Sequence, residues 1–230
     1  MKRFLLFLLT VILCLPLMTK AQQTVTVGTG TGTTYYTPFN SLWGYSFVEA
    51  IYTSSEITAA GGSAGVITSV SFEKSSGSAQ NNNIVLYMKN VSRSSFSSTS
   101  DWETVTTGDI VYTGTFNISS SGWATITLDD PFIWDGTSNL MVAMHENTSG
   151  YSTQYFYYTP VTNTVISAHS DSEDPNPYNL SSFGGTVYTQ SNRANMRIEL
   201  TAGAGCMSMS PTVSNIGPYS ADINWMNFQQ

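Results

Sequence analysis

The chain has 230 residues and a formal net charge of −7; only 10% of its residues are charged, whereas Phe, Trp and Tyr make up 13%. Such an acidic, weakly charged composition disfavours nucleic acid and anionic membrane surfaces as partners. Abundant Ser, Thr, Asn and Gly together with aromatic residues is typical of extracellular β-sandwiches.

The first 21 residues have the build of a secretory signal peptide. Lys2 and Arg3 precede an apolar run, residues 4–18, and a plausible cleavage point follows Ala21. The run is shorter than the roughly 20 apolar residues of a spanning helix, and Leu13 before Cys14 argues against a lipoprotein signal. Removal of residues 1–21 leaves 5 basic residues (8 − 3) against 15 acidic ones, a net charge of −10 (5 − 15). We therefore expect an exported protein, either extracellular or on the outer cell surface.

Short segments rich in β-branched and aromatic residues then recur between turn signals such as Ser76-Gly77 and Ser121-Gly122. Their lengths predict strands, and their spacing predicts an antiparallel β-sandwich. The predicted strands are 24–28, 63–74, 82–91, 108–116, 122–128, 139–144, 152–159, 162–168, 185–189 and 194–201.

Two segments of the sequence fit two structural interpretations each. In residues 45–60 the apolar pairs Phe47-Val48 and Ile51-Tyr52 are four apart, as on a helix face, but the β-branched content favours a strand. In residues 84–88 both alternating faces are apolar. This predicts a central strand buried on two sides, with a ligand platform on the outer face as the alternative.

Catalytic and cofactor motifs are not recognisable in the sequence. The two histidines, His145 and His169, lack the spacing of a zinc-protease helix. The glycine-rich segment 28–32 is not followed by a Lys-Ser/Thr pair, so we predict a mobile loop rather than a phosphate cradle. The only cysteine after residue 21 is Cys206, which rules out an internal disulfide there. We predict no active site in residues 22–203.

An acidic segment, residues 171–179, could hold a structural calcium ion, because Ca²⁺ binds six to eight carboxylate, amide or carbonyl oxygens. The alternative is a solvated acidic loop. The segment Asp135–Asn139 is a weaker candidate, which we read as a turn. The predicted calcium ligands are Asp171, Glu173, Asp174 and Asn176.

Aromatic side chains are the other candidates for binding, because flat rings cover sugar faces or apolar protein patches while their polar tips hydrogen-bond. In residues 154–159 alternation puts Tyr155 and Tyr157 on one face and Phe156 and Tyr158 on the other. The alternative is that these rings pack into the core. The predicted ligand-binding residues are Trp102, Tyr155, Tyr157 and Tyr178.

The composition changes near residue 204. Cys206 and Pro211, followed by alternating Ala221, Ile223 and Trp225, resemble the first two strands of a fibronectin type III domain. Residues 204–230 are too few to bury a core of that kind. We therefore expect the sequence to be a fragment of a longer protein.

Residues 22–203 resemble a jelly-roll domain of secreted Bacteroidetes proteins, similar in layout to the adhesin domains of gingipain-type surface proteins. The resemblance rests on segments including 37–40, 50–57, 65–72, 84–91, 95–102, 111–116, 122–144 and 193–200. It implies a cell-surface adhesion or carbohydrate-binding module without catalytic activity, whose partner is a glycan or a host-matrix protein. The alternative is a structural spacer in a larger exported protein, with a protease or glycosidase encoded after Gln230.

Overall fold

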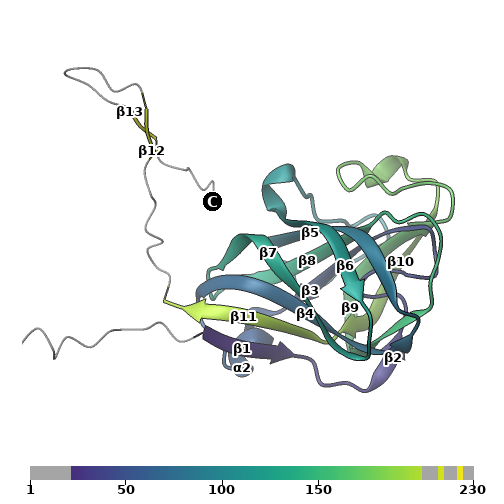
Figure 1. The fold of residues 1–230 in the computed structure, drawn as a ribbon, viewed down its shortest axis with the longest axis horizontal. Coiled ribbons are helices and arrows are strands. Elements are labelled where there is room, and N and C mark those ends of the chain that lie inside the picture. The colour runs from purple at the N-terminus through teal and green to yellow at the C-terminus, as the bar shows by residue number, and fades with distance from the viewer. Residues whose placement is uncertain (1–21, 204–211, 215–221, 225–230) are drawn as a thin grey trace, which may run out of the picture.

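The computed structural model describes residues 22–203, 212–214 and 222–224, and within them the fold is all-β and antiparallel, as predicted (Figure 1). The only helices in this part are one short α-helix, α2 (Ser54–Ala59), and two single 3₁₀ turns, η1 (Thr107–Asp109) and η2 (Leu180–Ser182). The strands of residues 22–203 are β1 (Gln22–Val27), β2 (Gly32–Thr34), β3 (Tyr45–Tyr52), β4 (Gly65–Gly77), β5 (Gln80–Val91), β6 (Ile110–Ile118), β7 (Gly122–Trp134), β8 (Asn139–Glu146), β9 (Gln154–Ser170), β10 (Thr186–Ala194) and β11 (Met196–Ala202).

These eleven strands form one strongly curled sheet. Its main path is β1-β11-β4-β9-β3-β8-β5-β6, while β7 pairs with β4, and β2 and β10 pair with β9 (Figure 1). The long strand β9 joins the two halves, because its first residues pair with β4 and its last residues pair with β3. The curl brings one face of the sheet inward, where it encloses the larger core.

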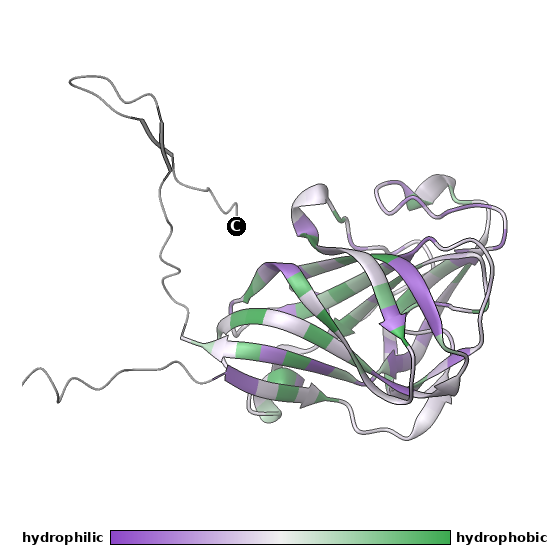
Figure 2. Ribbon diagram, in the orientation of Figure 1, coloured by the Kyte–Doolittle hydropathy of each residue, from purple (hydrophilic) through white to green (hydrophobic). Residues whose placement is uncertain are grey.

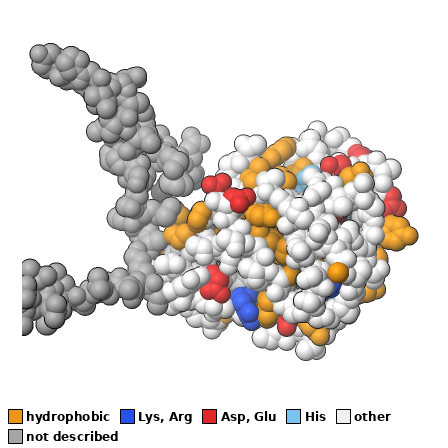
Figure 3. Space-filling model, viewed as in Figure 1, with side chains coloured by type: hydrophobic (Ala, Val, Ile, Leu, Met, Phe, Trp, Pro, Cys, Tyr) orange, Lys and Arg blue, Asp and Glu red, His pale blue; other side chains and the backbone are white. Residues whose placement is uncertain are grey.

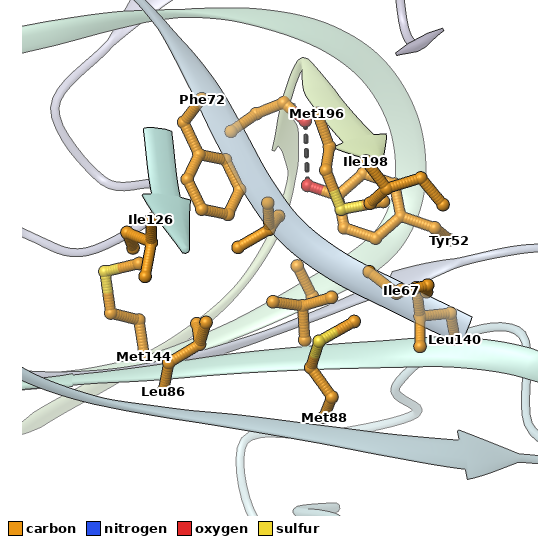
Figure 4. Close-up of a cluster of buried hydrophobic side chains, with 14 of the residues drawn as sticks. Tyr52, Ile67, Phe72, Leu86, Met88, Ile126, Leu140, Met144, Met196 and Ile198 are labelled. Atoms are coloured by element: carbon orange, nitrogen blue, oxygen red, sulfur yellow. Dashed lines mark hydrogen bonds between the residues drawn. The ribbon is translucent and has the colours of Figure 1, made fainter. Parts of the chain in front are cut away.

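Alternation along the strands decides which side chains enter this core. Apolar residues alternate with polar ones along the strands in Figure 2. In β5, Ile84, Leu86 and Met88 belong to the inner cluster, while Val85 and Tyr87 belong to a second cluster on the outer face. The prediction that this strand is buried on both sides is therefore confirmed. Figure 4 shows inner-core side chains from several strands packed together, including Tyr52, Ile67, Phe72, Leu86, Met88, Ile126, Leu140, Met144, Met196 and Ile198.

The second cluster exists because loop residues cover the outer face of the sheet. Phe47, Ile51 and Met141 point outward from their strands and are fully buried. Phe96 and Val105 cover them from the serine-rich loop, residues 92–106. The apolar outer face is thus internal packing rather than an open platform.

The prediction of a strand throughout residues 45–60 is wrong in its second half. Strand β3 ends at Tyr52, and helix α2 begins at Ser54. Thr53 caps this helix: its hydroxyl accepts a hydrogen bond from the Glu56 backbone N–H, and the Glu56 carboxylate accepts one from the Thr53 backbone N–H. This reciprocal capping box starts a helix where β-branched composition alone favours a strand.

The glycine-rich segment 28–32 is a loop as far as Thr31, and hydrogen bonds fasten it to neighbouring strands. The Gly30 backbone N–H donates to Thr159 Oγ1 at 2.9 Å, and its carbonyl accepts from Asn195 Nδ2 at 2.9 Å. A Cβ on Gly30 would lie 2.1 Å from the Tyr158 carbonyl oxygen. The glycine therefore allows this segment to lie directly against β9.

Two predicted strands, 152–159 and 162–168, are one continuous strand, β9. Asn163 lies within it at a positive φ of 54°, a conformation that Asn tolerates better than most residues. Strand β10 pairs along both sides of this position, with a register shift between Gln190 and Asn192. Pairing with β10 thus carries β9 through the local distortion.

Near the C-terminus, β12 (Thr212–Ser214) pairs with β13 (Asp222–Asn224) in an antiparallel hairpin. The expected leader, residues 1–21, and the positions Cys206, Pro211, Ala221 and Trp225 lie outside the described residues. Within the described segments, no helix has the length and apolar character to cross a membrane.

Candidate functional site: an aromatic pocket

The structure contains an open pocket of about 390 Å³. It lies where several loops meet the sheet. Its lining comes from the β2–β3 connection, the β8–β9 loop, the residues around the end of β9 and the first part of β10. The lining residues are Tyr35, Tyr36, Leu42, Trp43, Tyr151, His169, Asp171 and Tyr188. Six of the eight carry aromatic rings, and only Asp171 is acidic.

The rings of the pocket form two groups. Tyr35 and Tyr36 lie with centroids 4.2 Å apart, and the Tyr35 hydroxyl donates to the Tyr36 hydroxyl at 2.9 Å. The His169 ring lies 4.7 Å from that of Trp43 and 5.8 Å from that of Tyr188, with interplanar angles of 35° and 33°. These tilted contacts leave ring faces and hydroxyl tips available to a ligand.

The pocket is both anchored and open. His169 is 3% exposed and belongs to the sheet, whereas Tyr151 is 77% exposed and Tyr188 is 48% exposed. The combination of a buried ring and exposed rings is suited to holding a ligand on a fixed base while covering it with solvent-exposed aromatic surface.

Hydrogen bonds donated by backbone N–H groups hold the loop that carries Leu42 and Trp43. Asn40 N–H donates to Ser46 Oγ at 3.0 Å, and Leu42 N–H donates to Asn40 Oδ1 at 3.3 Å. Ser152 N–H donates to the Ser41 carbonyl oxygen at 2.7 Å, which ties this loop to the β8–β9 loop. The two sides of the pocket are therefore fastened to each other, which lowers the entropy cost of ordering them around a ligand.

Two ionisable rings of the pocket, those of Tyr36 and His169, are uncharged at neutral pH. The hydrogen bond with Tyr35, aided by burial, raises the pKa of Tyr36 to about 12. Burial lowers the pKa of His169, an effect that the nearby Asp171 opposes. The imidazole Nδ1 is buried and has no hydrogen-bond partner among the described residues. At neutral pH the formal charge of the lining is therefore that of Asp171 alone.

The Asp171 carboxylate lies at the edge of the pocket. Its Oδ1 accepts a hydrogen bond from the Gly44 backbone N–H at 3.1 Å, which fixes the carboxylate beside the loop of Trp43. Asp171 is exposed, so its charge is available to a ligand. Asp171 is one of the predicted calcium ligands, and the structure places it beside the aromatic rings of the pocket.

The predicted aromatic residues do not form one platform. Tyr155 comes nearest to the pocket, with its ring 6.0 Å from that of Tyr35, and Phe156 on the opposite face is fully buried, as alternation predicts. Tyr157 is half-buried and does not line the pocket. Tyr155 therefore lies beside the pocket, and neither tyrosine contributes to its lining.

The other two predicted rings lie over the second cluster. Trp102 is partly buried, with its ring 5.6 Å from Phe47. Tyr178 is 51% exposed, and its hydroxyl lies 3.4 Å from that of Tyr87. The Trp102 ring thus packs its loop against the sheet, which is the alternative to ligand binding.

The four predicted calcium ligands are engaged with different partners. Glu173 accepts from Gly184 N–H at 3.1 Å, and the Oδ1 of Asp174 lies 2.6 Å from His145 Nε2. Asn176 Oδ1 accepts from Tyr178 N–H at 3.0 Å, and Asp171 is the pocket carboxylate. Over the described residues, His, Cys, Asp and Glu side chains form no group of three or more that could hold a metal ion. The Asp135 carboxylate accepts from Thr137 N–H and Ser138 N–H at 2.7 Å, as expected of a turn.

Most of the pocket cannot be recognised from the sequence, because its residues are far apart in the chain. Trp43 and His169 were each visible, but no local pattern connects them. One signal was available: Trp43 and Tyr151 directly precede predicted strands, and the loop residues of a sandwich gather at its ends.

Comparison with family models, curated proteins and solved structures finds no match to this chain. Chemically, the pocket offers flat rings, hydroxyl groups, one imidazole and one carboxylate.

Proposed function

We propose that this chain is a non-catalytic carbohydrate-binding module, of the adhesion type, that holds a sugar unit in the aromatic pocket. The supporting observation is the convergence of Tyr35, Tyr36, Trp43, Tyr151 and Tyr188 on one anchored hollow. Sugar rings have apolar C–H faces edged by hydroxyls, and aromatic rings with polar tips match both features. The volume of the hollow fits one or two sugar units rather than an extended protein surface.

The wider setting of the proposal comes from the sequence. The leader-like residues 1–21 support export, and the resemblance to Bacteroidetes jelly-roll domains supports a surface or extracellular location. The curled antiparallel sheet is compatible with a jelly-roll connection, which we include in the proposal.

Binding of a glycan panel to the purified protein, followed by calorimetry on the best ligand, tests this function. Truncating an exposed pocket ring, Tyr151→Ala, should weaken binding about fivefold, because aromatic contacts of this kind contribute about 1 kcal/mol. Trp43→Ala should weaken it at least as much.

The matched control is Tyr178→Ala, because Tyr178 is an exposed tyrosine on the acidic loop, residues 171–179, and lies outside the pocket. Its substitution should leave the affinity unchanged. If no glycan binds, or if Tyr151→Ala and Tyr178→Ala behave alike, the pocket is not a sugar site and the spacer function is favoured.

A further inference from the structure

The cationic groups of the described domain are already engaged. Each basic side chain after Lys20 has a partner: backbone carbonyls, carboxylates of the serine-rich loop, a carboxylate of helix α2, or a tryptophan ring. These residues are Lys74, Lys89, Arg93, Arg193 and Arg197.

The surface accordingly presents little positive charge to a ligand. Blue side chains occupy only small areas of the face drawn in Figure 3, which is mostly uncharged. None of the pocket-lining residues is Lys or Arg. An anionic sugar would therefore find no counter-charge here, and would be repelled by the excess of acidic residues.

A cationic group, in contrast, would meet two favourable features together. Among the described residues the Asp171 carboxylate accepts only the hydrogen bond of Gly44, through Oδ1, which leaves Oδ2 for a ligand. Trp43 and Tyr36 line the same pocket as this carboxylate, and aromatic faces attract cations. The neutral His169 adds no opposing charge.

We propose that the pocket selects sugars that carry a free, protonated amine, such as the glucosamine units of deacetylated chitin. This inference rests on the proposed sugar-binding function and names its substrate class. The sugar ring lies against the aromatic surface, and its ammonium group donates to Asp171 Oδ2. The four tyrosine hydroxyls at the pocket make a polyhydroxylated ligand fit better than a bare alkylammonium group.

Calorimetry with three oligosaccharides of equal length tests the proposal: glucosamine, N-acetylglucosamine and glucose oligomers. The amine-bearing oligomer should bind about fivefold more tightly than the other two, which is the contribution of one partly exposed ion pair. This advantage should shrink with added salt.

Asp171→Asn should remove the advantage while leaving the binding of the N-acetylated oligomer within about twofold. The control is Asp130→Asn, because Asp130 is an exposed carboxylate outside the pocket and its loss changes the net charge equally; it should leave the advantage intact.

The outcomes separate the two proposals. Equal binding of all three oligomers, or an advantage that survives Asp171→Asn, refutes the amine preference but leaves sugar binding standing. Absence of binding to every oligomer, together with a negative glycan panel, removes the proposed function and the amine preference with it.

Discussion

The indole of Trp43 lies against the imidazole of His169, with 4.7 Å between the ring centroids. This contact joins a loop residue to a buried residue of strand β9, 126 positions later in the chain (169 − 43). The base of the pocket is thus part of the sheet, and only the rim belongs to loops. Any ligand held there is supported by the same packing that stabilises the fold.

His169 should act through its ring rather than through its nitrogens. Since Nδ1 is buried without a partner among the described residues, His169→Phe should keep the contact with Trp43 and leave both stability and sugar affinity close to those of the parent. His169→Ala should lower the free energy of unfolding by about 2 kcal/mol and weaken binding. Thermal unfolding and calorimetry measure the two effects; equal damage by Phe and Ala would mean that a nitrogen is essential.

Glu56 should be one of the most costly surface carboxylates to remove. Arg193 is 1% exposed and donates to Glu56 Oε2 at 2.9 Å and to the Ile51 carbonyl oxygen at 2.8 Å. Glu56→Ala would leave this guanidinium buried without its counter-charge, at a cost of about 3–5 kcal/mol. Denaturant unfolding checks the value.

The control for this prediction is Glu103→Ala, whose carboxylate pairs with Lys89 near the surface and should cost less than about 1 kcal/mol. The pH dependence gives a second check. Burial acts to raise the pKa of Glu56, but hydrogen bonds from Arg193 and Thr53 outweigh it and lower the pKa to about 2. The stabilisation by Glu56 is therefore present above pH 4.5 and lost as the pH falls toward 2. Glu56→Ala should remove that acid-side loss.

Local patterns in the sequence predict most strands of the sheet and, for β5, which of its faces are buried. The alternation in residues 84–88 predicted burial on both faces of β5, and it was correct because strand side chains must alternate. The helix after Tyr52 was missed, although the capping pair Thr53 and Glu56 was visible in the sequence. The capping box was the better signal there, because a helix of six residues is too short for apolar periodicity to reveal.

The pocket could not be predicted by the same means. Tyr155 and Tyr157 stand out because four aromatic residues follow one another at positions 155–158, whereas Trp43, Tyr151 and Tyr188 lie in three separate segments of the sequence. Their convergence depends on how β9 joins the two halves of the sheet, which is a long-range property. Density along the chain therefore selected residues beside the pocket instead of those that line it.

Gly30→Ala should disturb the pocket from a distance. The added Cβ would lie 2.1 Å from the Tyr158 carbonyl oxygen, so the segment before β2 must move away from β9. We expect a loss of about 2 kcal/mol in stability and weaker sugar binding, because β2 leads directly into Tyr35. Gly108→Ala is the matched control: its Cβ would lie 3.5 Å from Thr106 Oγ1, an ordinary contact. If both variants unfold at the parental temperature, the close approach is unimportant.

Glu49 should make the domain less stable as the pH rises from 4.5 to about 8. This carboxyl group is fully buried on β3, and its Oε2 accepts a hydrogen bond from the Glu103 backbone N–H at 2.9 Å, which fastens the serine-rich loop to the sheet. Burial raises the pKa of Glu49 to about 8 from 4.5. The folded state therefore holds the proton more tightly than the unfolded chain, so stability is greatest below pH 4.5 and declines as the pH rises to about 8. Glu49→Gln, which keeps the acceptor but cannot ionise, should flatten this part of the curve of unfolding temperature against pH. Glu146→Gln should remove a separate decline that ends near pH 7, where burial places the pKa of Glu146. If the unfolding temperature of Glu49→Gln still declines by the same amount between pH 4.5 and about 8, ionisation of Glu49 is not the cause of the decline.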